Sequence, residues 1–265
     1  MNQGLAAHKV TLAYEQRVIA RDLSVAIPEG EITSIIGPNG CGKSTLLRAL
    51  SGLLEPTEGE VTFGGVPLKR IPRKRFATQV GLLPQTPIAP AGITVADLVG
   101  RGRYPHQGMF GRWAQEDYEA VAHALEVTQL SGLAERVVDE LSGGQRQRVW
   151  VAMALAQRAG TLLLDEPTTY LDVANQLEVL DLLVELEGTT IAMVLHDMNL
   201  AARYSGHIIA MKNGAIVAQG SPEEVVTEAI MGEVFGIRCR VESDPVTASP
   251  VVHPYGRHHV SPNAR

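Results

Sequence analysis

Residues 37–45 read GPNGCGKST, a pattern that can bind a phosphate group. Its glycines let several backbone N–H groups point at one phosphate, and Lys43 can reach the outer phosphate oxygens and assist the chemistry there. The hydroxyl of Ser44 suits Mg²⁺. An apolar run precedes the segment and a helical pattern begins at Lys43, which is the context such a loop requires. We therefore expect a nucleotide site lined by Gly37, Pro38, Asn39, Gly40, Cys41, Gly42, Lys43, Ser44 and Thr45.

Two carboxylates end a second apolar run, TLLLDEP at residues 161–167. Ligand sites of parallel α/β sheets lie at the carboxyl ends of the strands, so Asp165 and Glu166 fall where a nucleotide would bind. Asp165 fits as a Mg²⁺ partner, directly or through water. Glu166 would act on the attacking water as general base or orienter, a role worth roughly 10²–10⁴ in rate. The competing interpretation is a solvated pair that caps the next segment, which the upstream GKS disfavours.

Gln85 ends the apolar run VGLLPQ and His196 ends IAMVLH, so both belong at the same edge of the predicted sheet. A single histidine in such a place can be purely structural. Together with Asp165 and Glu166, however, these residues form a set of polar groups around the position of a γ-phosphate. Gln85 is therefore a candidate catalytic residue and Mg²⁺ ligand, and His196 a candidate catalytic residue.

A third segment, LSGGQRQRV at residues 141–149, predicts a helix start capped by Ser142. The glycines that follow leave backbone N–H groups bare, which suits an anion. At an exposed surface, a helix N-terminus stabilises an anion by only ~0.3–1 kcal/mol, so this segment is a weak site by itself.

The elements that must position these groups follow from the hydrophobic pattern. Apolar runs alternate with helical patterns, which predicts an α/β fold with a parallel sheet covered on both faces. Residues 87–159 show helical patterns without a convincing strand and read as an insertion into a core made of residues 1–86 and 160–241. Residues 242–265 are rich in Pro, Ser and His, so we expect a tail whose last part is poorly ordered.

Composition narrows the class of protein. The 265 residues are 45% apolar and 20% charged, and the net charge is −6, as in globular proteins with a full core and no broad nucleic-acid-binding face. Two cysteines, Cys41 and Cys239, lack a CxxC spacing and favour a reducing compartment. No run approaches the ~18 apolar residues of a membrane span, and no signal-peptide pattern is present, so another chain is expected to supply any span.

In this order and spacing, GPNGCGKST, Gln85, LSGGQ, LLLDEP, YLD and LHD resemble the ATPase subunits of ABC transporters over most of the chain. The resemblance implies a P-loop NTPase fold: a RecA-like parallel core, an antiparallel β layer and a helical signature subdomain, together forming one domain over residues 1–241. It implies that Gln85 touches Mg²⁺ and senses the γ-phosphate, and that His196 is the switch histidine. It also implies that Tyr14 stacks on adenine, although a strand aromatic can instead pack in a core.

The resemblance further implies a homodimer that binds two ATP. With one phosphate loop and one LSGGQ, a single copy can form only half of each of two sites. In a two-fold dimer, one copy completes its partner's site with Ser142, Gly143, Gly144, Gln145 and Asp172. ATP would hold the halves together, hydrolysis would release them, and the helical insertion would rotate relative to the core.

Longer segments narrow the resemblance to ATPases of the iron-chelate importer group. LVGRGRYPHQGMFGRW (98–113) and the late DPVTASPVV are most similar to those for ferric siderophores of the enterobactin type, with haem and vitamin B12 transporters sharing much of the pattern. TTY after the Walker B glutamate departs from many ABC ATPases but is typical of this group. The implied partners are a membrane permease gripped by the insertion and a periplasmic or lipoprotein binding protein. The subunit itself would be peripheral on the cytoplasmic face of the inner membrane.

Several alternatives stay open. A soluble ABC ATPase of DNA repair or translation usually has two cassettes or long coiled-coil or zinc insertions, which the sequence lacks. A P-loop kinase is disfavoured by LSGGQ and Glu166, whereas an exporter would share all the motor motifs. Cys41 could be a redox switch or simply a small residue in a tight loop. The C-terminal histidines His253, His258 and His259 could bind metal, though scattered histidines seldom do.

Overall fold

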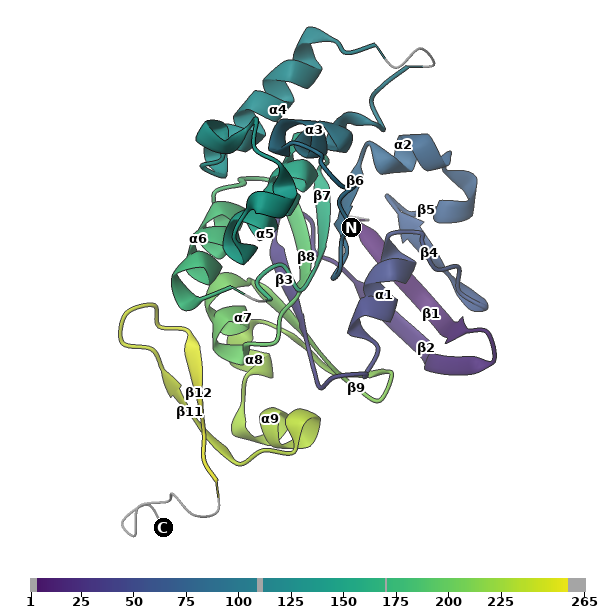
Figure 1. Ribbon diagram of the computed structural model, residues 1–265. Coiled ribbons are helices and arrows are strands. Elements are labelled where there is room, and N and C mark those ends of the chain that lie inside the picture. Colours follow the sequence, from purple (N-terminus) through teal and green to yellow (C-terminus); the bar gives the residue numbers. More distant parts are fainter. Residues whose placement is uncertain (1–3, 109–111, 170, 257–265) are drawn as a thin grey trace.

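The computed structural model describes residues 4–108, 112–169 and 171–256. Figure 1 shows a central sheet with a smaller antiparallel sheet on one side, helices on the other and a helical region above. Two apolar cores fill the layers, one on each side of the central sheet.

The central sheet has the strand order β10-β9-β3-β8-β7-β6. Its strands are β3 (Ile32–Ile36), β6 (Val80–Leu83), β7 (Thr161–Asp165), β8 (Thr190–Val194), β9 (His207–Lys212) and β10 (Ala215–Gly220). All pairs are parallel except that of β9 with β10. Every residue of β7 and β8 is buried, as expected for strands covered on both faces. The predicted parallel sheet is confirmed, and the residues that follow β3, β6, β7 and β8 meet at one edge.

The antiparallel layer covers one side of this sheet. It contains β1 (Leu5–Tyr14), β2 (Arg17–Ala26), β4 (Glu58–Phe63) and β5 (Val66–Pro67), in the order β2-β1-β4-β5. Helix α1 (Lys43–Leu50) lies between the two sheets (Figure 1). Its Leu46, Leu47 and Leu50 are fully buried, so apolar contacts fix the helix that carries Lys43 at its first position. The short η1 (Leu68–Arg70) and α2 (Arg73–Ala77) lead to β6.

The predicted helical insertion contains α3 (Val95–Gly100), η2 (Arg101–Arg103), α4 (Gln115–Val127), η3 (Ser131–Leu133), η4 (Val138–Glu140) and α5 (Gly143–Ala156). Among its described residues, the one β pairing is an isolated bridge between Thr94 and Val137. In the part of the chain that the structure describes, no helix combines the length and apolarity that crossing a bilayer demands.

A buried ion pair joins three elements of the insertion. Arg103 Nε lies 2.8 Å from Asp117 Oδ1, and both side chains are about 5% exposed. The same guanidinium donates to the Ala156 carbonyl oxygen at the end of α5 (2.9 Å), where a positive charge is favourable. Asp117 Oδ2 accepts from the backbone N–H of Ala114 at the start of α4. The pair therefore fixes α4 and η2 against the C-terminus of α5.

The remaining helices are α6 (Val173–Val184), α7 (Met198–Tyr204), α8 (Pro222–Val225) and α9 (Glu228–Phe235). After them, β11 (Cys239–Ser243) and β12 (Pro250–Pro254) form a hairpin that packs on α7. The sequence placed a boundary at 241 and a tail from 242, whereas the described chain stays folded through β12. This segment is folded because Cys239 of β11 and Val252 of β12 are buried in the main apolar core. His253 is exposed in β12, and His258 and His259 lie outside the described residues.

We expect Asp117→Ala to lower the free energy of unfolding by roughly 3–5 kcal/mol at pH 7, because Arg103 would remain buried without its partner. Burial raises the pKa of Asp117, but hydrogen bonds from Ala114 and Arg103 outweigh it, so the net pKa is below the ordinary value. The stabilisation is therefore present above the unfolded pKa and disappears as pH falls through the lower folded pKa. Urea unfolding at several pH values measures both effects.

Glu116→Ala is the matched control, since this neighbouring carboxylate is exposed. Its effect should stay within about 0.5 kcal/mol. Equal losses for the two variants would show that the buried pair does not stabilise the insertion.

Candidate active site

Close backbone contacts shape the loop between β3 and α1. Gly37 has a φ of 149°, and a Cβ there would lie 2.2 Å from the carbonyl oxygen of Met211 in β9, so only glycine fits. Gly42, with a φ of 108°, leads into α1, which begins at Lys43 as the sequence predicts. The loop thus turns tightly into a helix N-terminus, an arrangement that suits a phosphate.

Lys43 lies folded into this loop. The residue is 6% exposed, and its Nζ donates hydrogen bonds to the carbonyl oxygens of Gly37 (2.7 Å) and Pro38 (3.1 Å). A buried ammonium needs such acceptors. Charged phosphate oxygens form stronger hydrogen bonds with an ammonium than neutral carbonyls do. A bound phosphate can therefore replace one of these carbonyl oxygens as the acceptor of Lys43 Nζ, with only a short movement of the side chain.

A cavity of about 510 Å³ opens over the loop. Gln85, Glu166 and His196 come from the ends of three different strands, and the structure brings these three predicted residues together at this cavity. Four predicted residues of the phosphate loop and β7 do not line it: Gly37, Pro38, Cys41 and Asp165. The lining residues are Arg17, Ile19, Asn39, Gly40, Gly42, Lys43, Ser44, Thr45, Gln85, Glu166 and His196.

Ser44 lines the cavity and contacts Asp165, which is buried and does not line it. The Ser44 hydroxyl donates a hydrogen bond of 2.9 Å to Asp165 Oδ1, and Asp165 is 5% exposed. Burial raises the pKa of Asp165, while the Ser44 hydrogen bond opposes that shift. Among the described residues, no group of three or more His, Cys, Asp or Glu could enclose a metal ion. A hydroxyl beside a single carboxylate instead fits Mg²⁺, which binds few protein oxygens and takes other ligands from substrate phosphates and water.

Glu166 directly follows β7 in an uncommon backbone conformation. Its φ is 56°, in the left-handed region, which costs of order 1–3 kcal/mol for a non-glycine residue and is often found at functional sites. The carboxylate accepts two contacts on different oxygens: Oε1 lies 2.7 Å from His196 Nε2, and Oε2 accepts a 3.0 Å hydrogen bond from Thr169 Oγ1. The surrounding fold therefore holds this carboxylate in one orientation.

The environment also keeps Glu166 ionised. Burial raises the pKa of its carboxyl group, but the polar side chains of Gln85, His196 and Thr169 around it outweigh burial and bring the net pKa below the ordinary value. An ionised, oriented carboxylate at a cavity wall can accept a hydrogen bond from a water molecule and direct it at a phosphorus atom. The geometry thus fits hydrolysis of a nucleotide.

The model of the family described as "ABC transporter" matches residues 20–169, more than half of the chain. This chain belongs to the ABC transporter family. It is 50% identical over 256 residues to the ferric enterobactin transport ATP-binding protein of Escherichia coli (strain K12), covering 96% of this chain and 94% of that protein. It is 48% identical over 254 residues to the iron(3+)-hydroxamate import ATP-binding protein of Bacillus subtilis (strain 168), with 95% and 94% covered.

A solved structure of a bacterial ABC transporter cassette in its dimeric form is also similar. The TM-score is 0.73 at 29% sequence identity, and the alignment covers 82% of this chain and 98% of that one. The chain is thus an ABC ATPase with the expected cassette fold, which confirms the predicted family, fold class and ATPase activity.

The ABC signature segment lies apart from this cavity in the same chain. None of Ser142, Gly143, Gly144, Gln145 and Asp172 lines the cavity. Ser142 caps α5 by accepting from the N–H of Gln145 (3.3 Å), and the N–H of Ser142 donates in turn to Gln145 Oε1 (3.1 Å). A Cβ on Gly144 would lie 3.2 Å from Asn175, whose N–H donates to the Asp172 carboxylate at the start of α6. The signature and Asp172 therefore form a second, separate surface.

Tyr14 is another predicted residue that does not line the cavity. It ends β1 and is 40% exposed, and its strand partner is Arg17 in β2. Arg17 and Ile19 line the cavity instead, and sequence reasoning missed both. The sequence signal that could have identified Arg17 and Ile19 was the β1–β2 hairpin, because a short turn after Tyr14 leads directly to these residues. Adenine stacking by Tyr14 stays a prediction.

Cys41 is buried within the phosphate loop. Burial raises the pKa of its thiol, although the nearby Lys43 charge acts in the opposite direction. A thiol with a raised pKa forms little of the reactive thiolate. This environment favours Cys41 as a small residue that packs in the loop over Cys41 as a redox switch.

We expect Glu166→Gln to keep ATP binding within a few-fold and to lower the hydrolysis rate by about 10²–10⁴-fold, because an amide cannot take up a proton from water. Phosphate release and equilibrium binding of a fluorescent ATP analogue measure the two effects. Glu187→Gln is the control, since this carboxylate is exposed beyond α6. Turnover by Glu166→Gln at the rate of the unchanged protein would mean that another group activates the water.

Proposed function

We propose that this chain is the ATP-hydrolysing subunit of an importer of ferric siderophores and that it works as a homodimer. The observation that carries the proposal is the convergence of Lys43, Gln85, Glu166 and His196 on one cavity in a chain without its own signature segment at that cavity. The 50% identity to a ferric enterobactin transport protein supports a ferric siderophore as the cargo, because the similarity extends over 96% of the chain and thus beyond the motor motifs.

The separation of the two surfaces supports the dimer. Ser142 and Gly143 are exposed at the first turn of α5. The N–H of Ser142 is bonded to the Gln145 side chain, whereas the N–H of Gly143 can meet a ligand held by another molecule. In a two-fold arrangement, each signature segment faces the phosphate loop of its partner, and Asp172 lies at the same seam. Closure of the dimer removes water from the phosphates. In this drier environment, the N-terminus of α5, a weak anion site at an exposed surface, binds the phosphate more strongly.

Within each site, the residues divide the work. The loop N–H groups and Lys43 bind the β- and γ-phosphates, and Tyr14 contacts the adenine. Ser44, Gln85 and Asp165 would hold Mg²⁺, which supplies positive charge beside the phosphates when it is bound. Glu166 orients the attacking water and receives its proton, while His196 holds the Glu166 carboxylate at 2.7 Å.

The remaining partners follow from the same assignment. The helical insertion is braced internally by Arg103 and Asp117, so it can act as one body that grips a permease. The subunit would lie on the cytoplasmic face of the inner membrane, where ATP is available, and a binding protein would deliver the cargo on the other face.

Mixing two inactive variants tests the dimer. Lys43→Ala disables the phosphate loop, and Ser142→Arg blocks the signature segment. In a mixed dimer, the intact phosphate loop of one copy faces the intact signature segment of the other. Random pairing should therefore restore about a quarter of the original ATPase activity, because half of the dimers are mixed and each has one intact site. If each site lay within one chain, the mixture would show no more phosphate release than the two variants assayed separately.

Uptake of radiolabelled iron tests the cargo. Cells that lack this chain should lose accumulation of ferric enterobactin-type siderophore. The unchanged chain should restore it, whereas the Glu166→Gln variant should not. Haem and vitamin B12 uptake are measured in the same strains. Unchanged iron uptake with a loss of haem or B12 uptake would replace the siderophore assignment with that cargo.

A further inference from the structure

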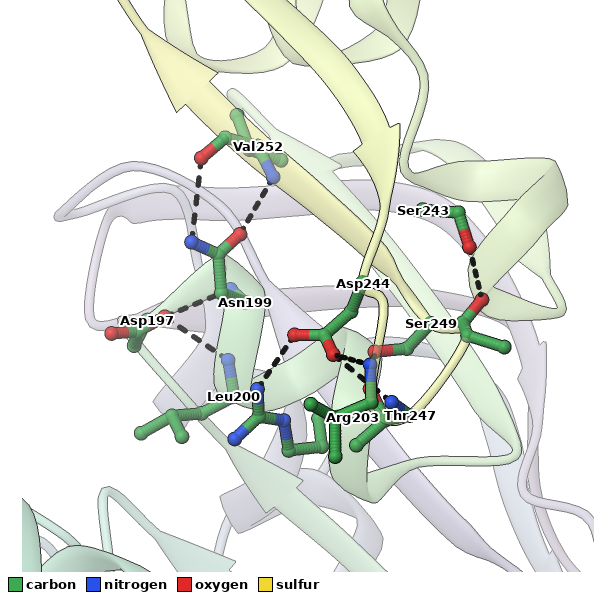
Figure 2. A network of polar contacts seen from close by, with 11 residues as sticks. Asp197, Asn199, Leu200, Arg203, Ser243, Asp244, Thr247, Ser249 and Val252 are labelled. Carbon is green, nitrogen blue, oxygen red and sulfur yellow. Dashed lines mark hydrogen bonds and ion pairs between the residues drawn. The ribbon is translucent and has the colours of Figure 1, made fainter.

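The hairpin β11–β12 is attached to α7 through the side chain of Asn199 (Figure 2). The Asn199 amide oxygen accepts from the backbone N–H of Val252 at 2.8 Å, and its Nδ2 donates to the Val252 carbonyl at 3.3 Å. One amide thus satisfies both backbone groups of a residue in β12, as a neighbouring strand would. The hairpin and the helix are therefore held in a defined register.

A second attachment lies one helical turn further along α7. Arg203 donates to Asp244 Oδ2 at 2.9 Å (Figure 2). Asp244 Oδ1 accepts from the N–H groups of Val246 and Thr247. Asp244 thus fixes the turn of the hairpin as it pairs with the arginine. Because residues four apart lie on the same face of a helix, Asn199 and Arg203 fix that face of α7 to the hairpin at two points.

Helix α7 begins directly beside the active site. Only Leu195, His196 and Asp197 separate the end of β8 from the start of α7. Leu195 is 2% exposed, and the Asp197 carboxylate caps α7 by accepting from Asn199 and Leu200. With a buried residue on one side and a helix cap on the other, the backbone of His196 has little freedom. Its position follows that of α7.

The His196 side chain has few other constraints. It is 45% exposed although its Nε2 lies 2.7 Å from Glu166. Among the described residues, this is its one hydrogen bond or ion pair. The contact therefore depends on where the backbone places the imidazole.

We propose that Asn199 and Arg203 are positioning residues of the ATPase: by fixing α7 to the C-terminal hairpin, they hold His196 against Glu166. This inference rests on the roles proposed above for Glu166 and His196. It gives the folded C-terminal hairpin a part in catalysis, although none of its residues lines the nucleotide cavity.

The test uses the full chain and single substitutions, because removing the hairpin would also remove Cys239 and Val252, which are buried in the main apolar core. Asn199→Ala and Arg203→Ala should each lower kcat by about 3–10-fold, since small misplacements of a catalytic group are costly, and should leave KM for MgATP within about two-fold. Arg203→Lys keeps the charge and should retain most of kcat. Ser243→Ala is the matched control, since among the described residues the Ser243 hydroxyl bonds within the hairpin alone, to the Ala248 carbonyl.

A double-mutant cycle separates positioning from general destabilisation. If Asn199 acts through His196, Asn199→Ala should lower kcat in the unchanged chain and have no further effect in a His196→Ala background. Equal fold-losses in both backgrounds, or a kcat unchanged by Asn199→Ala while His196→Ala lowers it, would overturn the positioning role alone. A kcat unchanged by His196→Ala would instead refute the proposed role of His196 and the positioning role with it.

Discussion

The parallel register of β3, β8, β7 and β6 is the constraint on which the active site depends. Ile35 and Asp165 both pair with Val194, and Leu83 pairs with Leu164, so neighbouring strands end almost level. The phosphate loop, His196, Glu166 and Gln85 each follow one of these ends and therefore converge without long connecting segments. The packing of the two cores specifies this register, because a slip by one residue would move every side chain of the buried β7 and β8 into the opposite core.

Much of the site could be predicted from sequence because its information is local. Lys43, Asp165 and Glu166 each stand directly at the end of an apolar run or at the start of a helical one, so chain order alone places them at the sheet edge. The same holds for the Asn213–Gly214 turn between β9 and β10, where positive φ values of 50° and 79° suit those two residue types. Local signals of this kind do not depend on how distant segments pack.

The features that sequence could not supply are contacts between distant segments. Arg103 and Asp117 look like ordinary surface charges until α4 and α5 pack around them. Ile19 becomes a cavity wall only because β2 passes the phosphate loop, where its Cγ2 would lie 3.2 Å from a Cβ on Gly42. The hairpin β11–β12 was hidden because the composition of residues 242–256 is typical of a tail. Its stability comes from α7 and the buried core.

The signature helix α5 is tied to the core at both of its ends, which limits how the insertion can move. Near its start, Gln147 Nε2 donates to the carbonyl oxygen of Pro167, one residue beyond Glu166, at 2.7 Å. At its end, the Gln157 amide donates to the carbonyl oxygens of Ala77 and Val80, where β6 begins its run toward Gln85. A rigid insertion that rotates must pivot about these amides or break them. Since one amide adjoins the Glu166 loop and the other adjoins β6, movement of the signature segment acts on the Glu166 loop and on the strand that leads to Gln85.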